Sequence, residues 1–179
     1  MRNLPGSDLL RNRTYVLRAA RMSPHQRAAY TRLRSRFVIA PHPDRQLTPA
    51  ELGFTGGEDR RVLDVGFGMG YALADLAEAN PTWRFVGLEV YRPGVGKLMS
   101  ELEKRDLQNV RILEHDAVHA FRSALPNSAF DGIHIFFPDP WQKKKHHKRR
   151  LVQDGFPELV APLFKPGGYL YLVTDWDDY

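Results

Sequence analysis

The stretch from Arg61 to Tyr71, Arg-Val-Leu-Asp-Val-Gly-Phe-Gly-Met-Gly-Tyr, decides the fold of this chain. Residues 61–65 are a short apolar run, which indicates a buried strand, and residues 71–79 have the apolar spacing of an amphipathic helix. The glycines between them lack a Cβ, so the backbone there can approach a ligand closely. The stretch therefore predicts a strand, a ligand-binding loop and a helix.

The same alternation of strands and helices continues along the chain. Alternating elements favour right-handed crossovers and a mostly parallel sheet with helices on both faces, so we predict a Rossmann-like α/β fold. The further predicted strands are residues 83–90, 110–113, 130–137 and 169–173, and the further predicted helices are residues 96–105, 118–123 and 156–164.

An acidic residue follows or ends each predicted strand: Asp64, Glu89, Asp116, Asp139 and Asp175. The carboxyl ends of parallel strands meet at one edge of a sheet, and ligands bind there. Glu89 can accept hydrogen bonds from both ribose hydroxyls, Asp116 can meet an adenine amino group, and Asp64 can meet an ammonium. These acids together predict a ligand with an adenosine at one end and a cation at the other.

The glycine spacing separates two classes of nucleotide cofactor. A dinucleotide fingerprint would place its third glycine at position 71, which is Tyr71 here, whereas Gly70 completes the Gly-x-Gly-x-Gly spacing preferred by methyltransferases. We therefore predict S-adenosylmethionine, with S-adenosylhomocysteine as product, and keep a nicotinamide-dependent oxidoreductase as the weaker alternative. The chain has no cysteine, which excludes a thiol nucleophile and zinc-thiolate sites.

Positive charge is concentrated in two blocks of the sequence. Residues 1–40 hold nine arginines and a single acid, Asp8, and residues 143–150 hold six lysines and arginines and no acid. Such blocks suit a polyanionic partner such as nucleic acid. We divide the chain into a basic N-terminal arm and linker, residues 1–48, and a catalytic domain, residues 49–179. Apolar periodicity in the arm is weak, although Ser23-Pro24 resembles a helix start, so we expect the arm to become ordered on RNA.

The most specific local feature is Phe136-Phe137-Pro138-Asp139-Pro140-Trp141, at the end of a predicted buried strand. Its two prolines restrict the backbone and fix the position of Asp139. If a methyl acceptor is a nitrogen with a free lone pair, such as guanine N7, no proton has to leave. Asp139 would then hold donors on the guanine edge and offset the positive charge that develops on the purine.

The chain resembles the bacterial tRNA (guanine-N7-)-methyltransferases, which have the class I methyltransferase fold and act on guanine 46 of the variable loop. The resemblance runs from about Arg13 to the last residue. It rests on residues 64–70, Leu88-Glu89-Val90, Pro93-Gly94-Val95-Gly96, His115-Asp116-Ala117, residues 136–141, Lys148-Arg149-Arg150 and Thr174-Asp175-Trp176.

The resemblance implies roles for particular residues. Asp139 is the implied catalytic residue, and Lys143 and Asp175 are implied to contact the RNA. The full set expected to bind the cofactor is Asp64, Gly66, Gly68, Gly70, Glu89, Val90, Asp116, Ala117 and Asp139. The set expected to bind the RNA is Lys143, Lys148, Arg149 and Asp175.

The chain departs from the family pattern in two places. Asp64 stands where many members have Glu, and the sequence ends at Tyr179, before the helix, the closing strand pair and the Thr-x-Phe/Tyr-Glu motif of the family. We therefore expect a C-terminally incomplete domain, and a non-catalytic module that binds S-adenosylmethionine and RNA is a further alternative.

The sequence also sets expectations for location and partners. It has no apolar run long enough to span a bilayer and no signal peptide, so we expect a cytoplasmic protein with tRNA as partner and no membrane association. No metal is expected, and the oligomeric state, monomer or homodimer, is left open.

Overall fold

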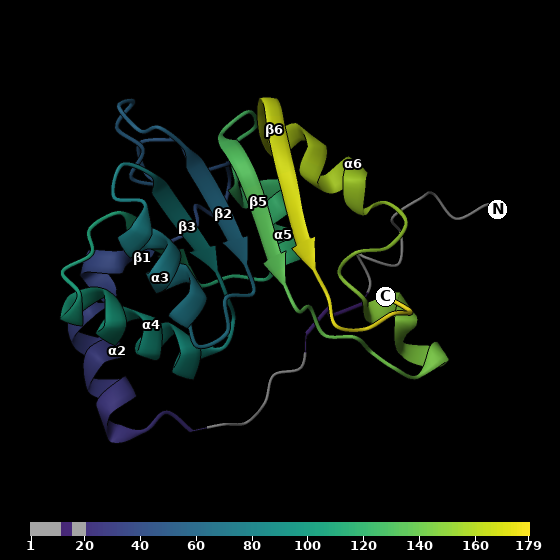
Figure 1. Ribbon diagram of the computed structural model, residues 1–179, viewed down its shortest axis with the longest axis horizontal. Helices are drawn as coiled ribbons and strands as arrows, with labels where there is room; N and C mark the ends of the chain where they lie inside the picture. Colours follow the sequence, from purple (N-terminus) through teal and green to yellow (C-terminus); the bar gives the residue numbers. More distant parts are fainter. Residues whose placement is uncertain (1–11, 16–20) are drawn as a thin grey trace.

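A six-stranded parallel sheet forms the centre of the computed structural model, which describes residues 12–15 and 21–179 (Figure 1). The spatial order of the strands is β1-β4-β3-β2-β5-β6. Strands β3 and β4 are added on one side of β2, and β5 and β6 on the other, as in doubly wound folds. The predicted Rossmann-like fold is confirmed. The strands are β1 (Val38–Ile39), β2 (Arg61–Val65), β3 (Arg84–Leu88), β4 (Val110–Leu113), β5 (Phe130–Phe136) and β6 (Phe164–Val173).

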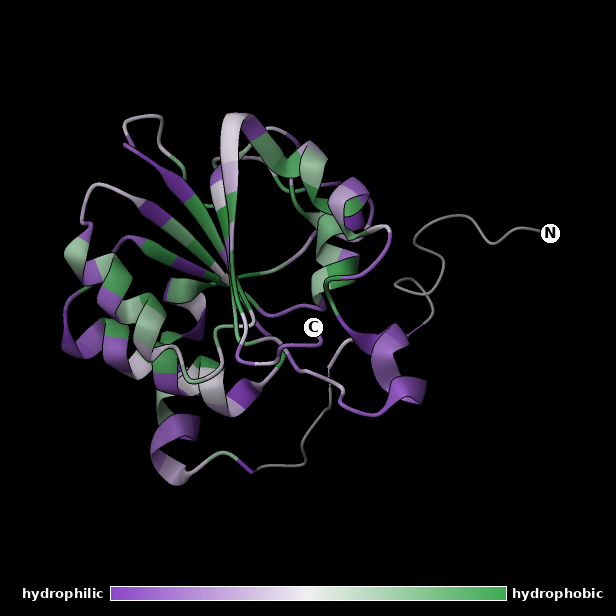
Figure 2. Cartoon of the chain, turned by 45° about the vertical axis from the view of Figure 1, so that its right-hand side comes forward, coloured by the Kyte–Doolittle hydropathy of each residue, from purple (hydrophilic) through white to green (hydrophobic). Residues whose placement is uncertain are grey.

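Helices cover both faces of this sheet, and each face has its own buried cluster. On one face lie α2 (Pro24–Phe37), α3 (Tyr71–Ala79) and α4 (Arg92–Lys104). On the other lie α5 (Ala117–His119) with the π-helical turn η1 (Ala120–Ala124), and α6 (Phe156–Val160) with the 3₁₀ turn η3 (Ala161–Leu163). Figure 2 shows apolar strands at the centre and a hydrophilic 3₁₀ helix, η2 (Lys144–Arg149), at the periphery. No helix of the described part of the chain is long and apolar enough to cross a membrane.

Helix α2 was not expected from the weak periodicity of the arm. Ser23 caps it with a complete capping box to Gln26, and Pro24 occupies its first turn. Its buried residues, Ala29, Leu33 and Phe37, recur every fourth position. This stripe is one residue wide among arginines, which is why the apolar signal is weak, yet it is sufficient to pack α2 on the domain. The expectation that the arm lacks packed structure therefore differs from the structure for residues 24–39; residues 1–11 and 16–20 lie outside the described part.

Two glycines of helix α4 permit close approach of neighbouring backbone. A Cβ on Gly94 would lie 1.9 Å from the Gly68 carbonyl oxygen, and one on Gly96 would lie 2.7 Å from the Gln26 carbonyl oxygen. The first contact brings α4 against the glycine-rich loop, and the second brings α2 against α4. The Pro-Gly-Val-Gly segment is thus explained by packing.

The predicted elements have somewhat different bounds in the structure. The second strand ends at Leu88, so that Glu89 lies just beyond it, and the helix predicted over 156–164 becomes 3₁₀ after Val160. Strand β6 begins at Phe164 and includes Pro166, with an irregular register against β5 near Gly132. Proline is tolerated at an edge strand, and β6 is the last strand of the described sheet.

Candidate active site

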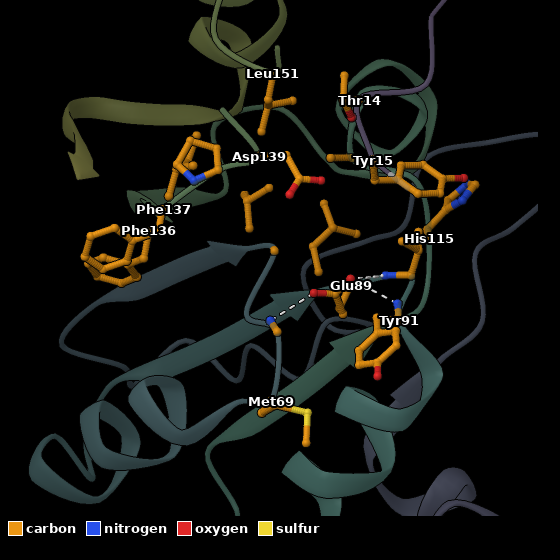
Figure 3. A pocket seen from close by; sticks show the side chains of 18 residues that line it. Thr14, Tyr15, Met69, Glu89, Tyr91, His115, Phe136, Phe137, Asp139 and Leu151 are labelled. Carbon is orange, nitrogen blue, oxygen red and sulfur yellow. Dashed lines mark hydrogen bonds between the residues drawn. The ribbon is translucent and has the colours of Figure 1, made fainter. Parts of the chain in front are cut away.

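A cleft of about 470 Å³ lies at the carboxyl ends of β2, β3 and β5, where the fold predicts a ligand (Figure 3). This volume is in the range of small-molecule sites. It is lined by Thr14, Tyr15, Val65, Gly66, Gly68, Met69, Leu88, Glu89, Val90, Tyr91, His115, Ala117, Ile135, Phe136, Phe137, Pro138, Asp139 and Leu151. Six of the residues predicted to bind the cofactor are therefore gathered here: Gly66, Gly68, Glu89, Val90, Ala117 and Asp139.

The glycines of the loop after β2 serve two different purposes. Gly66 and Gly68 have φ angles of 75° and 58°, and an added Cβ at either would have nothing within 4 Å. Both therefore present bare backbone to open space. Gly70, at φ 77°, begins helix α3, and a Cβ there would lie 2.6 Å from the Leu98 side chain. Gly70 does not line the cleft, and its requirement for glycine comes from packing and backbone conformation.

Glu89 ties the glycine-rich loop to the turn before α4. One carboxylate oxygen accepts a hydrogen bond from the Gly68 N–H at 2.9 Å, and the other accepts from the N–H groups of Val90 and Tyr91 at 2.7 and 3.0 Å. The dashed lines in Figure 3 mark these bonds. A carboxylate has about four acceptor positions, so the oxygen facing Gly68 retains one for a further donor.

Asp64 lies in β2 and is 2% exposed, so its carboxyl group does not line the cleft. Burial, and then the neighbouring Glu89 carboxylate, raise the pKa of Asp64 to about 7. A buried acid with this pKa is poised to ionise when a cation arrives beside it.

The end of β4 contributes to the cleft mainly through residues on either side of Asp116. The Asp116 carboxylate accepts a hydrogen bond from the His119 N–H at 2.9 Å and thereby caps α5. His115 and Ala117 line the cleft, whereas Asp116 does not. Burial lowers the pKa of His115, which favours a neutral imidazole on this wall. Among the described residues, no group of three His, Cys, Asp or Glu side chains could hold a metal ion.

Asp139 projects into the cleft from the loop after β5, on the side opposite Tyr91 in Figure 3. The loop is bounded by two non-glycine residues in the left-handed region, Phe137 at φ 50° and Trp141 at φ 45°. Such conformations cost about 1–3 kcal/mol each and persist where surrounding contacts enforce them. Here the Phe137 N–H donates to the Val173 carbonyl at 2.8 Å. Asp139 itself is exposed, so its carboxylate is accessible to a substrate.

The far end of this loop is held by a buried arginine whose role was not predicted from the sequence. Arg150 is 7% exposed and donates to the Pro140 carbonyl at 2.9 Å, next to Asp139. It also contacts the carbonyl and carboxylate of Asp178. The Tyr179 hydroxyl accepts from the N–H groups of Leu151 and Val152 at 3.1 and 3.3 Å, which fixes the same region.

The residues predicted to bind RNA lie beside the cleft rather than in it. Lys143 directly precedes η2, and Lys143 and Lys148 are exposed, with no ion pair to an acid in the described part of the chain. Asp175 is exposed two residues beyond β6, whose Val173 is paired with Phe136 of β5. Arg149 differs, because its guanidinium contacts the backbone of residues 13–15 and the Trp141 ring.

Several lining residues were not predicted from the sequence. Met69, Tyr91 and His115 each lie next to a predicted site residue and within four positions of the end of a strand. This position in the sequence could have identified them as lining residues. Thr14 and Tyr15 are more than 50 positions from the glycine-rich loop, and no local pattern marks them.

Comparisons with known proteins agree with this geometry. A family model described as "Putative methyltransferase" matches residues 58–179. The chain is 47% identical over 169 residues to the tRNA (guanine-N(7)-)-methyltransferase of Thiobacillus denitrificans, which covers 94% of this chain and 73% of the relative. It is 43% identical over 178 residues to the protein of the same name from Neisseria gonorrhoeae, which covers 99% of this chain and 73% of the relative.

Solved structures of methyltransferases share the fold. An aminoglycoside resistance methyltransferase superposes with a TM-score of 0.54 at 23% identity, over 74% of this chain and 64% of that chain. An antibiotic related methyltransferase gives a TM-score of 0.52 at 22% identity, over 74% and 67%. The fold is thus that of methyltransferases, and the sequence relatives define the group more narrowly. The chain belongs to the family of tRNA (guanine-N(7)-)-methyltransferases.

Proposed function

We propose that this chain transfers a methyl group from S-adenosylmethionine to N7 of a guanine in tRNA, at position 46 of the variable loop. The observation that carries the proposal is the exposed Asp139 carboxylate in the same cleft as Glu89 and the glycine-rich loop, in a chain whose relatives carry this name. Family membership also favours methyl transfer over hydride transfer by a nicotinamide enzyme.

The residues of the cleft fit S-adenosylmethionine. The open space beside Gly66 and Gly68 admits a ligand against bare backbone. The remaining acceptor position of Glu89 suits a ribose hydroxyl, and Val90 and Ala117 provide apolar walls for an adenine. Asp64, buried close by with a pKa near 7, would ionise opposite the ammonium of the methionine moiety.

Bound S-adenosylmethionine supplies an electrophilic methyl group on a sulfonium. The guanine N7 lone pair forms the new N–C bond, the electron pair of the broken S–C bond stays on sulfur, and no proton leaves. Asp139 therefore orients the guanine by accepting from its N–H groups and stabilises the positive charge that develops on the purine. Its rigid loop keeps the carboxylate in position before the substrate arrives.

The basic run provides the complementary surface for tRNA. Lys143, Lys144, Lys145 and Lys148 are exposed and lie a few residues beyond Asp139. Phosphate contacts from such lysines would position the RNA without reading its sequence. Selection of one guanine then depends on RNA shape and on the base pocket.

The test is incubation with labelled S-adenosylmethionine and unmodified tRNA, followed by chain scission at 7-methylguanine to locate the product. The proposal predicts label at guanine 46. A guanine-46 variant of the tRNA is the matched control and should accept no label. Label on another base, or none with an intact chain that binds S-adenosylhomocysteine, would contradict it.

A further inference from the structure

A short segment near the N-terminus, residues 13–15, contributes two residues to the cofactor cleft. Thr14 and Tyr15 line the cleft together with Gly66, Glu89 and Asp139. Thr14 is 9% exposed and Tyr15 is half-buried, so these two residues pack onto the domain, whereas Arg13 is exposed. Figure 3 shows Thr14 and Tyr15 on the side of the cleft opposite Phe136 and Phe137. We refer to residues 13–15 as the strap.

Two side chains hold the strap by three consecutive backbone carbonyls. Arg149 Nε donates to the Arg13 carbonyl at 3.0 Å, and its Nη2 donates to the Tyr15 carbonyl at 3.3 Å. Between them, Trp141 Nε1 donates to the Thr14 carbonyl at 3.2 Å. Because every acceptor is a main-chain carbonyl, these bonds fix the path of the strap rather than one of its side chains.

The two donors are themselves fixed relative to each other. The Arg149 guanidinium carbon lies 3.8 Å from the centre of the Trp141 ring, a close cation–π contact. Trp141 also meets His146 edge to face, with ring centres 5.9 Å apart. Its left-handed backbone, φ 45°, is a conformation that persists only where such contacts enforce it.

The neighbouring lysine shows that this arrangement is particular to Arg149. Lys148 carries the same charge in the same 3₁₀ helix, yet its side chain is exposed and, within the described part of the chain, makes no hydrogen bond or ion pair to the strap. A planar guanidinium can stack on an indole and donate from two edges at once, which an ammonium cannot do. Arg149 therefore has contacts within the protein that Lys148 lacks, and its predicted contact with RNA stays a prediction.

We propose that Arg149 and Trp141 form a latch that holds the strap against one side of the cofactor cleft and slows cofactor release. They are positioning residues, since neither lines the cleft. The inference rests on the proposed function for the identity of the ligand. It assigns to one arginine of the basic run a role in cofactor retention, which differs from contact with tRNA phosphates.

The test measures S-adenosylhomocysteine binding to the intact chain without RNA, by titration calorimetry and by dissociation rate in stopped flow. Arg149→Ala should release the ligand about five- to tenfold faster, since two hydrogen bonds and a ring contact are lost. Lys148→Ala, the matched control, should leave the dissociation rate unchanged. Trp141→Phe keeps an aromatic ring and removes the indole N–H donor, so we expect about a threefold increase in the dissociation rate.

The variant Arg149→Lys distinguishes the latch from an effect of positive charge alone. The lysine keeps one positive charge but has neither the planar group that stacks on the Trp141 ring nor two separated donor nitrogens for the Arg13 and Tyr15 carbonyls. The latch therefore predicts most of the Arg149→Ala effect on ligand release and almost none on tRNA affinity. A double variant with Tyr15→Ala extends the test. The effects of Tyr15→Ala and Arg149→Ala on dissociation should be less than additive, because both act through the strap.

Equal dissociation rates for the unaltered chain, Arg149→Ala, Arg149→Lys and Trp141→Phe would overturn the latch. The proposed function would remain in force if those proteins still bound the ligand and methylated tRNA. Failure of the unaltered, folded chain to bind S-adenosylhomocysteine would overturn both. If Arg149→Ala fails to fold, as judged by circular dichroism, Trp141→Phe and Arg149→Lys still decide the question.

Discussion

The two walls of the cleft are built in different ways. The cofactor wall comprises Gly66, Gly68, Met69 and residues 88–91, and it is joined by bonds such as Glu89 to Gly68, 21 positions apart. The base wall, residues 136–139, lies in a loop that is held by Arg150, by Val173 and by the bond from Trp141 to Thr14 of the strap, 127 positions away. The first wall is a property of one strand–loop–helix unit and its neighbour, whereas the second depends on the whole chain being folded. Ligand binding and methyl transfer should therefore respond to different substitutions.

The largest expected effect is on the rate of methyl transfer and comes from a substitution in the base wall. Asp139→Ala should lower the rate of 7-methylguanine formation by about a thousandfold, because a preorganised charge opposite the developing purine cation is lost. Affinity for S-adenosylhomocysteine should fall only modestly, by about threefold. Methyl transfer to tRNA and titration calorimetry give the two values. An unchanged rate would remove Asp139 from the chemistry, and loss of all ligand binding would move it to the cofactor wall.

Glu89→Gln should instead affect ligand binding. The amide keeps the size of the side chain but offers a single acceptor oxygen in place of two, so the N–H groups now bonded to Glu89 and the ribose compete for it. We expect about a 100-fold weaker affinity for S-adenosylhomocysteine. Asp116→Asn is the comparison, since asparagine also caps helices well and the carboxylate does not line the cleft; about threefold weakening is expected. Equal losses would contradict the distinction drawn between these two acids.

Arg150→Ala tests whether the base wall depends on contacts between distant segments of the chain. Removal of a buried cation leaves the Pro140 carbonyl and Asp178 without their donor, and we expect the free energy of unfolding to fall by about 2–3 kcal/mol. Urea denaturation measures this, with the exposed Lys145→Ala as control, expected to change it by less than about 0.5 kcal/mol. In the folded variant, transfer should be slowed more than ligand affinity is reduced. A stability equal to that of the unaltered chain would show that Arg150 does not support the loop.

The smallest expected effect concerns pH and Asp64. In the free protein the pKa of Asp64 is about 7, and an ammonium bound beside it would lower that pKa. Affinity for S-adenosylhomocysteine should therefore rise as pH increases, by at most about tenfold per unit below pH 7, and level off above it. Asp64→Asn should remove this dependence. A pH profile that survives this substitution would assign the titration to another group.

The same ionisation affects stability with a defined sign. Between the ordinary pKa of 3.8 and the folded value near 7, the folded chain binds more protons at Asp64 than the unfolded chain does. The contribution of this residue to stability is therefore complete below about pH 4 and is lost as pH rises through 7. Thermal unfolding without ligand, compared between the unaltered chain and Asp64→Asn, measures this contribution.

The division between the walls also explains what could be predicted from sequence. The strands, the glycine-rich loop and the positions of Glu89 and Asp139 follow from local apolar periodicity, from turn residues and from the rule that parallel strands end at one edge. The packing of α2, the strap and the role of Arg150 depend on contacts between distant segments, for which no local pattern exists. Asp116 and Gly70 illustrate a third case. Each has a structural role, as a helix cap and in packing, that the sequence did not indicate, and their contact with the cofactor stays a prediction.

A crystal structure of this chain with S-adenosylhomocysteine would show directly whether the two walls enclose one ligand. We expect the ligand in the cleft between both walls, with a ribose hydroxyl on Glu89, its adenine near Val90 and Ala117, and its sulfur facing the space in front of Asp139. Ligand bound outside this cleft, or bound with its sulfur remote from Asp139, would contradict it.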